Sequence, residues 1–239
     1  MTSSARAKAG RLIAVATLAA ALAGCMADRD TTGSILPTSA SRSVATPATS
    51  EARLRQMSEK YAAAYQRNPN DAATAYAYGV TLRALGQRAQ ALAVLESASI
   101  KHPQQKQIVG AYGRALADAG RYQDALNALA NAHTPEQPDW RILNAQGAAL
   151  DQLGRSAEAR AYYESALKIA PGEPSVLSNL GLSYALNNDL ARAEQTLAMA
   201  AQSPKANESV RANLALVQSL KARAGAGPAK PQKAVRPAA

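Results

Sequence analysis

The sequence is poor in the residues that build metal sites and disulfide frameworks. It contains one cysteine and two histidines, His102 and His133, in 239 residues. A single cysteine forms no intramolecular disulfide, and this set is too small for the usual structural zinc sites. We therefore expect no metal and no cofactor. Both histidines lie near the predicted C-terminal ends of helices, where we assign them to favourable interactions with the helix dipole.

Signatures of catalysis are also missing. The chain has no glycine-rich phosphate loop before a strand, no G-x-S-x-G and no H-E-x-x-H. Its carboxylates are scattered singly along the sequence, which is typical of solvated helix surfaces. We therefore predict that the protein is not an enzyme. An enzyme with an unrecognised site is the alternative from another class of function.

The net charge of +10 lies mostly at the two ends of the chain. Residues 1–24 contribute +3 and residues 221–239 contribute +5, which leaves +2 for everything between them. A nucleic-acid-binding surface needs basic residues clustered on the folded body. The nearly balanced body therefore predicts no nucleic-acid binding.

The N-terminus has the layout of a secretion signal. A basic segment, MTSSARAKAGR, precedes the apolar stretch Leu12–Gly24. With 13 residues, this stretch is too short for a helix to cross a bilayer core of about 30 Å. A basic start followed by a short apolar stretch predicts a signal peptide over residues 1–24.

The signal ends in Leu22, Ala23, Gly24 and Cys25, the only cysteine. This ending resembles the lipobox of bacterial lipoproteins, which implies that the Cys25 sulfur receives a diacylglycerol and that Cys25 becomes the first mature residue. An ordinary signal peptide with an incidental cysteine is the alternative. Met26 replaces the aspartate that favours inner-membrane retention, so the resemblance implies an outer-membrane anchor with the body facing the periplasm.

Two further segments have too few large apolar residues for a folded core. Residues 25–50 are rich in Ser, Thr, Ala and Pro, and residues 224–239 read AGAGPAKPQKAVRPAA. Such compositions are typical of flexible chain. We predict a lipidated cysteine and flexible tether over residues 25–50 and a disordered basic tail over residues 224–239.

The body between these segments repeats at a constant interval of about 34 residues, the spacing of Gly79 from Gly113. The interval is set by four groups of small residues, which are Gly79, Gly113, Gly147 and Gly181; Gly86, Gly120, Gly154 and Asn188; Ala91, Ala125, Ala159 and Ala193; and Ala98, Ala132, Ala166 and Ala200. The Gly79 group falls in mid-helix, where glycine costs about 1 kcal/mol relative to alanine, so we expect a close contact to compensate. The Gly86 group is placed to end a helix in the left-handed conformation, in which asparagine best replaces glycine.

This pattern resembles the tetratricopeptide repeat, a pair of helices with a period of about 34 residues. The resemblance implies an all-α solenoid, in which antiparallel helix pairs stack in a right-handed superhelix over residues 51–223. The expected units are a half repeat (51–71), four repeats (72–105, 106–139, 140–173 and 174–206) and a capping helix (207–223).

In this family the concave face is lined by first-helix residues three before, one after and four after the mid-helix glycine. The resemblance thus implies a peptide groove with the candidate residues Tyr76, Val80, Arg83, Arg114, Asn144, Asp151, Ser178 and Leu182. Repeats that grip a C-terminal carboxylate have Lys and Asn where this chain has Tyr76 and Val80. The sequence therefore gives no support to that mode of binding.

Signal, tether and repeats together indicate a lipid-anchored scaffold of the cell envelope. The arrangement resembles the repeat lipoproteins of tight-adherence (Tad, Flp-type) pilus systems, which implies a pilotin-like role beside a secretin. The alternative in the same class is a scaffold for outer-membrane protein insertion or for cell-wall synthesis.

Overall fold

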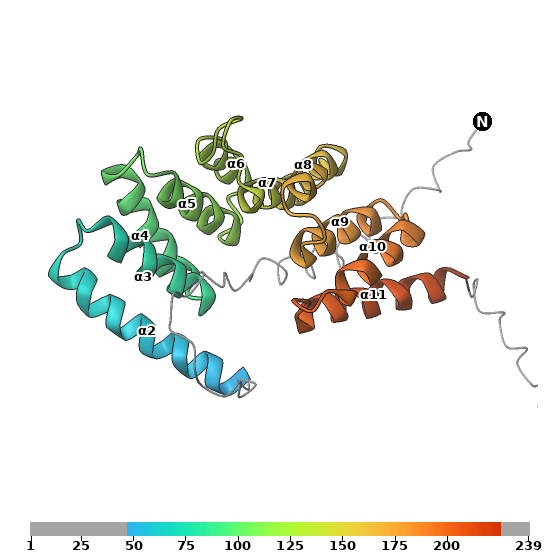
Figure 1. The fold of residues 1–239 in the computed structure, drawn as a ribbon, viewed down its shortest axis with the longest axis horizontal. Coiled ribbons are helices and arrows are strands. Elements are labelled where there is room, and N and C mark those ends of the chain that lie inside the picture. Colours follow the sequence, from blue (N-terminus) through green and yellow to red (C-terminus); the bar gives the residue numbers. More distant parts are fainter. Residues whose placement is uncertain (1–46, 226–239) are drawn as a thin grey trace, which may run out of the picture.

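In the computed structural model, residues 47–225 form a curved row of antiparallel helices (Figure 1). The helices are α2 (Pro47–Arg67), α3 (Ala72–Ala84), α4 (Arg88–Lys101), α5 (Lys106–Asp118), α6 (Tyr122–Ala130), α7 (Trp140–Gln152), α8 (Ser156–Ile169), α9 (Pro174–Leu186), α10 (Leu190–Gln202) and α11 (Glu208–Gly225). The described residues include no strand, only an isolated bridge between Thr134 and Gln137. The all-α solenoid predicted from the sequence is confirmed.

Four helix pairs repeat along the row. Their first helices, α3, α5, α7 and α9, begin at the constant interval found in the sequence, and each packs on the second helix that follows it. Successive first helices also contact one another, from α3 through α11, so they line the inner side of the curve. Helices α2 and α11 form the two ends of the arc (Figure 1).

The turn between the helices of each pair uses the left-handed conformation. The φ angles are 72° at Gly86, 79° at Gly120, 76° at Gly154 and 61° at Asn188. Because side chains disfavour this region, glycine is the usual residue there and asparagine its best substitute. The predicted role of this group is confirmed.

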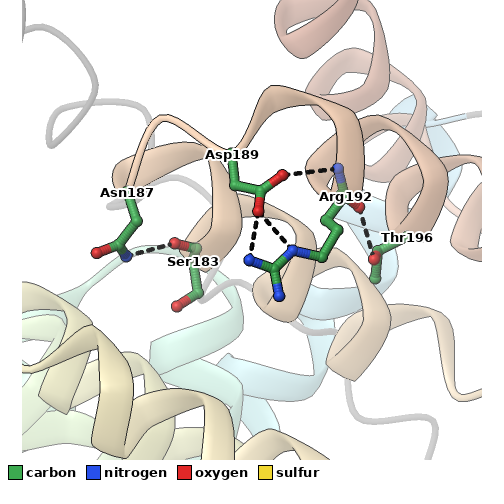
Figure 2. Close-up of polar contacts among 5 residues, drawn as sticks. All are labelled: Ser183, Asn187, Asp189, Arg192 and Thr196. Atoms are coloured by element: carbon green, nitrogen blue, oxygen red, sulfur yellow. Dashed lines mark hydrogen bonds and ion pairs between the residues drawn. The ribbon is translucent and has the colours of Figure 1, made fainter.

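Polar side chains support the one turn that lacks glycine (Figure 2). The Asn187 amide donates to the Ser183 carbonyl oxygen at 2.9 Å, which satisfies a carbonyl at the end of α9. The Asp189 carboxylate accepts from the backbone N–H of Arg192 at 3.1 Å and pairs with the Arg192 guanidinium. These bonds cap α9 and α10 on either side of Asn188.

The mid-helix glycines lie against the largest side chain of the partner helix. A Cβ on Gly79 would lie 2.4 Å from Leu95 Cγ, and one on Gly147 would lie 2.5 Å from Tyr163 Cε1. The corresponding distances at Gly113 and Gly181 are 2.7 Å, to leucine Cγ atoms. The close contact predicted for these glycines is confirmed.

Replacing Gly147 with alanine should destabilise the solenoid despite alanine's better helix propensity. The added methyl would press on the Tyr163 ring, whose hydroxyl is held by Asp151. Overpacking of about 1–3 kcal/mol outweighs a propensity gain of about 1 kcal/mol, so the Tm measured by circular dichroism should fall by a few degrees. Gly225→Ala is the matched control, because a Cβ there meets nothing within 4 Å. An unchanged Tm for Gly147→Ala would contradict this packing.

The described helices extend beyond two predicted boundaries. Helix α2 begins at Pro47 rather than at residue 51, because proline is well suited to a first helical turn. Helix α11 continues to Gly225, two residues into the predicted tail. The signal peptide, Cys25, most of the tether and residues 226–239 lie outside the described residues. Within residues 47–225, no helix combines the length and apolarity needed to cross a membrane.

Candidate functional site

The second repeat departs from the others between its second helix and the next first helix. Helix α6 has nine residues, whereas α4, α8 and α10 have 13 or 14. Pro135 and Pro138 prevent a helix from continuing through residues 131–139. The backbone N–H of Gln137 instead donates to Thr134 Oγ1 at 3.2 Å, closing a turn. Asp139 then starts α7 by accepting from the backbone N–H of Arg141 at 2.8 Å.

This loop and three first helices enclose a hollow of about 430 Å³ on the inner side of the solenoid. We call it the basic hollow. It is lined by Tyr76, Lys106, Gln107, Arg114, Ala132, His133, Thr134, Gln137, Asp139, Arg141 and Ile142. Residues from α3, α5, α7 and the α6–α7 loop therefore converge on one site.

The lining of the basic hollow carries more positive than negative charge. Lys106, Arg114 and Arg141 face one carboxylate, that of Asp139. The Asp139 carboxylate lies 3.9 Å from Arg141 Nη1 and also caps α7. Lys106 Nζ donates to the Asn131 carbonyl oxygen at 2.8 Å, which fixes the ammonium at the rim. The positive excess favours an anionic ligand group.

His133 adds a polar atom to this lining. Its Nδ1 is buried and forms no hydrogen bond with any residue of the described range. A buried polar nitrogen without a partner is costly, and a ligand group that bonds it removes that cost. The imidazole nitrogen donates or accepts according to its tautomer. His133 lies beyond the end of α6, in the loop, and not at the helix terminus where its dipole role was predicted.

Two of the four candidate groove residues in the first two repeats reach the basic hollow. Tyr76 and Arg114 line it. Val80 instead packs beside Leu95, and Arg83 pairs with Asp118 at 2.6 Å across the first two repeats. Tyr76 and Arg114 thus face the basic hollow, whereas the other two hold neighbouring helices together.

Lys106, His133 and Arg141 could not be predicted as site residues from the repeat, because none of them occupies one of the three groove positions of a first helix. A usable signal was the displaced proline of the second repeat, Pro138, which lies one residue from the place that Pro103 and Pro171 occupy. That displacement marks an irregular loop, and loops at repeat junctions often contribute to ligand sites.

The candidate groove residues of the last two repeats are buried, which corrects their interpretation as ligand contacts. Their exposed fractions are 7% for Asn144, 7% for Asp151, 4% for Ser178 and 1% for Leu182. Three of these side chains bond to the next first helix, Asn144 to Asn179, Asp151 to Ser183 and Ser178 to Asn213, and therefore do not face an open groove. They therefore hold successive repeats together.

Polar side chains of this group form hydrogen bonds with side chains of the next first helix, about one repeat further along the sequence. Asn179 Nδ2 donates to Asn144 Oδ1 at 3.0 Å, and Asn213 Nδ2 donates to Ser178 Oγ at 3.0 Å. Buried polar groups that find specific partners fix the register of the helices that carry them. These two bonds set how α7, α9 and α11 align.

Asp151 is a buried carboxylate at the same interface. It accepts from the Tyr163 hydroxyl at 3.0 Å and from the Ser183 hydroxyl at 2.9 Å. Burial raises the pKa of Asp151 above its usual 3.8, while bonds from hydroxyls and the charge of Arg160 partly oppose the rise. The carboxylate joins the third repeat to the fourth, and nothing in this arrangement provides an open site for substrate.

The effect of replacing Asp151 with asparagine on stability should be more favourable at neutral pH than in acid. Because its folded pKa is raised, the Asp151 contribution to stability is fully present below pH 3.8 and falls as the pH rises through the folded pKa. Asparagine does not titrate. The Tm of Asp151→Asn minus that of wild type should therefore increase from pH 3.5 to pH 7. A difference that is constant or decreases over this range would contradict the raised pKa.

The basic hollow can bind an anionic group by charge and hydrogen bonds. In the part of the chain that the structure describes, no cluster of three or more His, Cys, Asp or Glu is placed to hold a metal ion. An inner groove on stacked helix pairs defines the class of helical-repeat proteins that bind other polypeptides.

The comparisons place the chain in a family within this class. The model of the tetratricopeptide repeat matches residues 76–139, 136–174 and 144–207, more than half of the chain. The protein belongs to the tetratricopeptide repeat family. Members of this family bind protein partners and typically act as non-catalytic scaffolds. No curated protein matches the chain.

Solved structures share the fold at low sequence identity. A chain of the APC/C hetero-tetramer Cut9–Hcn1 has a TM-score of 0.61 and 22% identity, with 74% of this chain and 35% of that chain covered. A thermophilic repeat protein of Thermus thermophilus has a TM-score of 0.61 and 20% identity, with coverage of 71% and 93%. MamA of Desulfovibrio magneticus RS-1 has a TM-score of 0.51 and 18% identity, with coverage of 66% and 97%. The chain thus spans about a third of the first structure's length.

Proposed function

We propose that the protein is a lipid-anchored scaffold of the bacterial cell envelope that holds an acidic segment of a partner protein in the basic hollow. The observation that carries the binding site is the convergence of Lys106, Arg114, His133 and Arg141 on one hollow of the inner surface. The anchor is supported by Cys25 at the end of a lipobox-like sequence. The tether would let the body reach partners away from the membrane.

The ligand chemistry follows from the lining of the basic hollow. A carboxylate of a partner can pair with the cationic groups, and an acceptor or donor can reach His133 Nδ1. Tyr76 and Ile142 add apolar surface beside these charges. An extended or helical segment with acidic and apolar residues fits this combination.

Within the envelope, the role we favour is assembly of a Tad (Flp-type) pilus machine, in which the scaffold assists a secretin as pilotins do. This step is supported by the combination of lipobox, tether and repeats. The second candidate is a scaffold for outer-membrane protein insertion or cell-wall synthesis, which the same combination also suits.

Photocrosslinking in intact cells distinguishes these candidates. A photoreactive amino acid at position 107 is suitable, because Gln107 is exposed and lines the basic hollow. We expect an adduct with a pilus secretin or another pilus component. An adduct with insertion or cell-wall machinery would replace the first candidate by the second. The absence of any protein adduct would contradict both.

A further inference from the structure

Within residues 47–225, α2 is a second helix without a first helix of its own. It packs on α3, as α4 packs on α5, and Met57 lies one full repeat before Ala91. Met57 is 37% exposed, whereas the four equivalent alanines of the complete repeats are 0% exposed. Tyr61 is half-buried, whereas its equivalents are at most 1% exposed. The side chains Leu54, Met57 and Tyr61 form what we call the outer face of α2.

The preceding chain does not have the sequence of the missing helix. A first helix in register would occupy residues 38–50, which read TSASRSVATPATS. These residues include one large apolar side chain, Val44, and have Ala45 in place of glycine at the position equivalent to Gly79. Moreover, α2 itself begins at Pro47, seven residues before the equivalent of Arg88, where α4 begins. Residues 47–50, which would end a first helix in this register, thus belong to α2.

The opposite end of the solenoid is finished differently. Among the described helices, α11 is a first helix without a second, and its outer side presents Arg211, Ala215 and Gln218, all exposed. The equivalents in the fourth repeat are Leu177, Gly181 and Tyr184. A polar outer side is how terminal repeats are normally capped. The outer face of α2 is apolar instead, so it does not have the character of a capped end.

A row of basic residues borders the outer face of α2. Arg53, Lys60 and Arg67 are exposed and lie seven residues apart, so they share one edge of the helix. Each lies next to the apolar stripe and away from Tyr65, which packs toward α3. The acidic residues Glu51 and Glu59 lie on other sides of the helix, and Glu51 pairs with Arg55 at 2.6 Å. The edge is therefore positively charged.

We propose that the outer face of α2 binds an amphipathic helix of another protein that has an acidic edge. The helix occupies the place of the missing first helix and covers Leu54, Met57 and Tyr61, while its acidic edge pairs with Arg53 and Lys60. It has a small residue over Tyr61, as Gly147 lies over Tyr163. This site lies on a different helix from the basic hollow and does not depend on the proposed function.

A pair of stapled peptides tests this proposal. Both have the sequence of α7, the helix that naturally covers a tyrosine, with the position of Gln146, which borders the helix face that carries Gly147, changed to Glu in one and to Lys in the other. Binding to the full chain is measured by fluorescence anisotropy. We expect the acidic peptide to bind at least about tenfold more tightly than the basic one. Equal binding of the two peptides would overturn the charge assignment.

Variants of the full chain locate the binding. Met57→Glu with Tyr61→Glu should weaken the acidic peptide at least about tenfold, because it puts charge into the apolar contact. Arg53→Glu with Lys60→Glu changes only exposed residues and should reverse the preference between the peptides. Arg88→Glu, which changes an exposed cation at the start of α4, is the control and should change nothing. Binding that is insensitive to the α2 substitutions would overturn the proposal. So would a wild-type dimer in sedimentation that Met57→Glu dissociates, because the occupant would then be a second copy.

Discussion

Replacing Cys25 with alanine should abolish fatty acylation completely and move the protein from the membrane fraction to the soluble fraction. Cys25 is the only thiol of the chain, so no second residue can accept the thioether-linked lipid. Each buried methylene contributes about 0.8 kcal/mol to membrane binding, and two or more acyl chains are needed for stable anchoring. If Cys25 carries the lipid, as we propose, loss of its sulfur removes the anchor as a whole.

The measurement is metabolic labelling with a fatty-acid analogue, followed by fractionation. Met26→Ala is the control, because it changes the neighbouring residue and leaves the thiol in place. The control should retain the label and the membrane association. Label on the Cys25→Ala protein, or an unlabelled wild type, would contradict lipidation.

Reversing two charges in the basic hollow should abolish capture of the partner. Lys106→Glu with Arg141→Glu replaces two cations by two anions, and both residues are exposed, so the fold should be unaffected. The reversal removes two attractive charge pairs with an acidic partner segment and replaces them with repulsion. We therefore expect the amount of co-purified partner to fall at least about tenfold.

The matched control changes the charge equally at two places outside the basic hollow. Arg88→Glu with Lys205→Glu also replaces two exposed cations, one at the start of α4 and one after α10. Co-purification should survive in this control, and both variants should melt like wild type. An equal loss of co-purified partner in the two variants would mean that binding depends on the net charge of the protein and not on the basic hollow.

The fold could be predicted from the sequence because the small residues of the repeating groups act through local geometry. Gly86 and Asn188 indicate a left-handed backbone, and Gly79 and Gly147 indicate a close contact between two helices. Both requirements are local and do not depend on the rest of the chain. These requirements recur once in every repeat and are therefore readable. These residues therefore show where the two helices of each repeat lie in the sequence.

The site could be predicted only in part, because exposure depends on how closely neighbouring repeats pack. Arg114 and Leu182 occupy the same repeat position, yet Arg114 lines the basic hollow and Leu182 is 1% exposed. The repeat period alone does not determine the distance between neighbouring first helices or the path of the loop at Pro135. Leu182 is consequently a core residue and does not contact a ligand.

The inner surface is tested most directly by comparing crosslink yields from several positions of the solenoid in intact cells. Photoreactive residues at positions 107, 100 and 199 would be compared; Gln107 lines the basic hollow, and Ile100 and Met199 are 74% and 52% exposed on second helices. If the protein binds its partner through the inner surface, position 107 should give a strong partner adduct and the other two positions little. A partner adduct from position 100 or 199, with none from position 107, would place binding on the outer surface and rule out the basic hollow as the binding site.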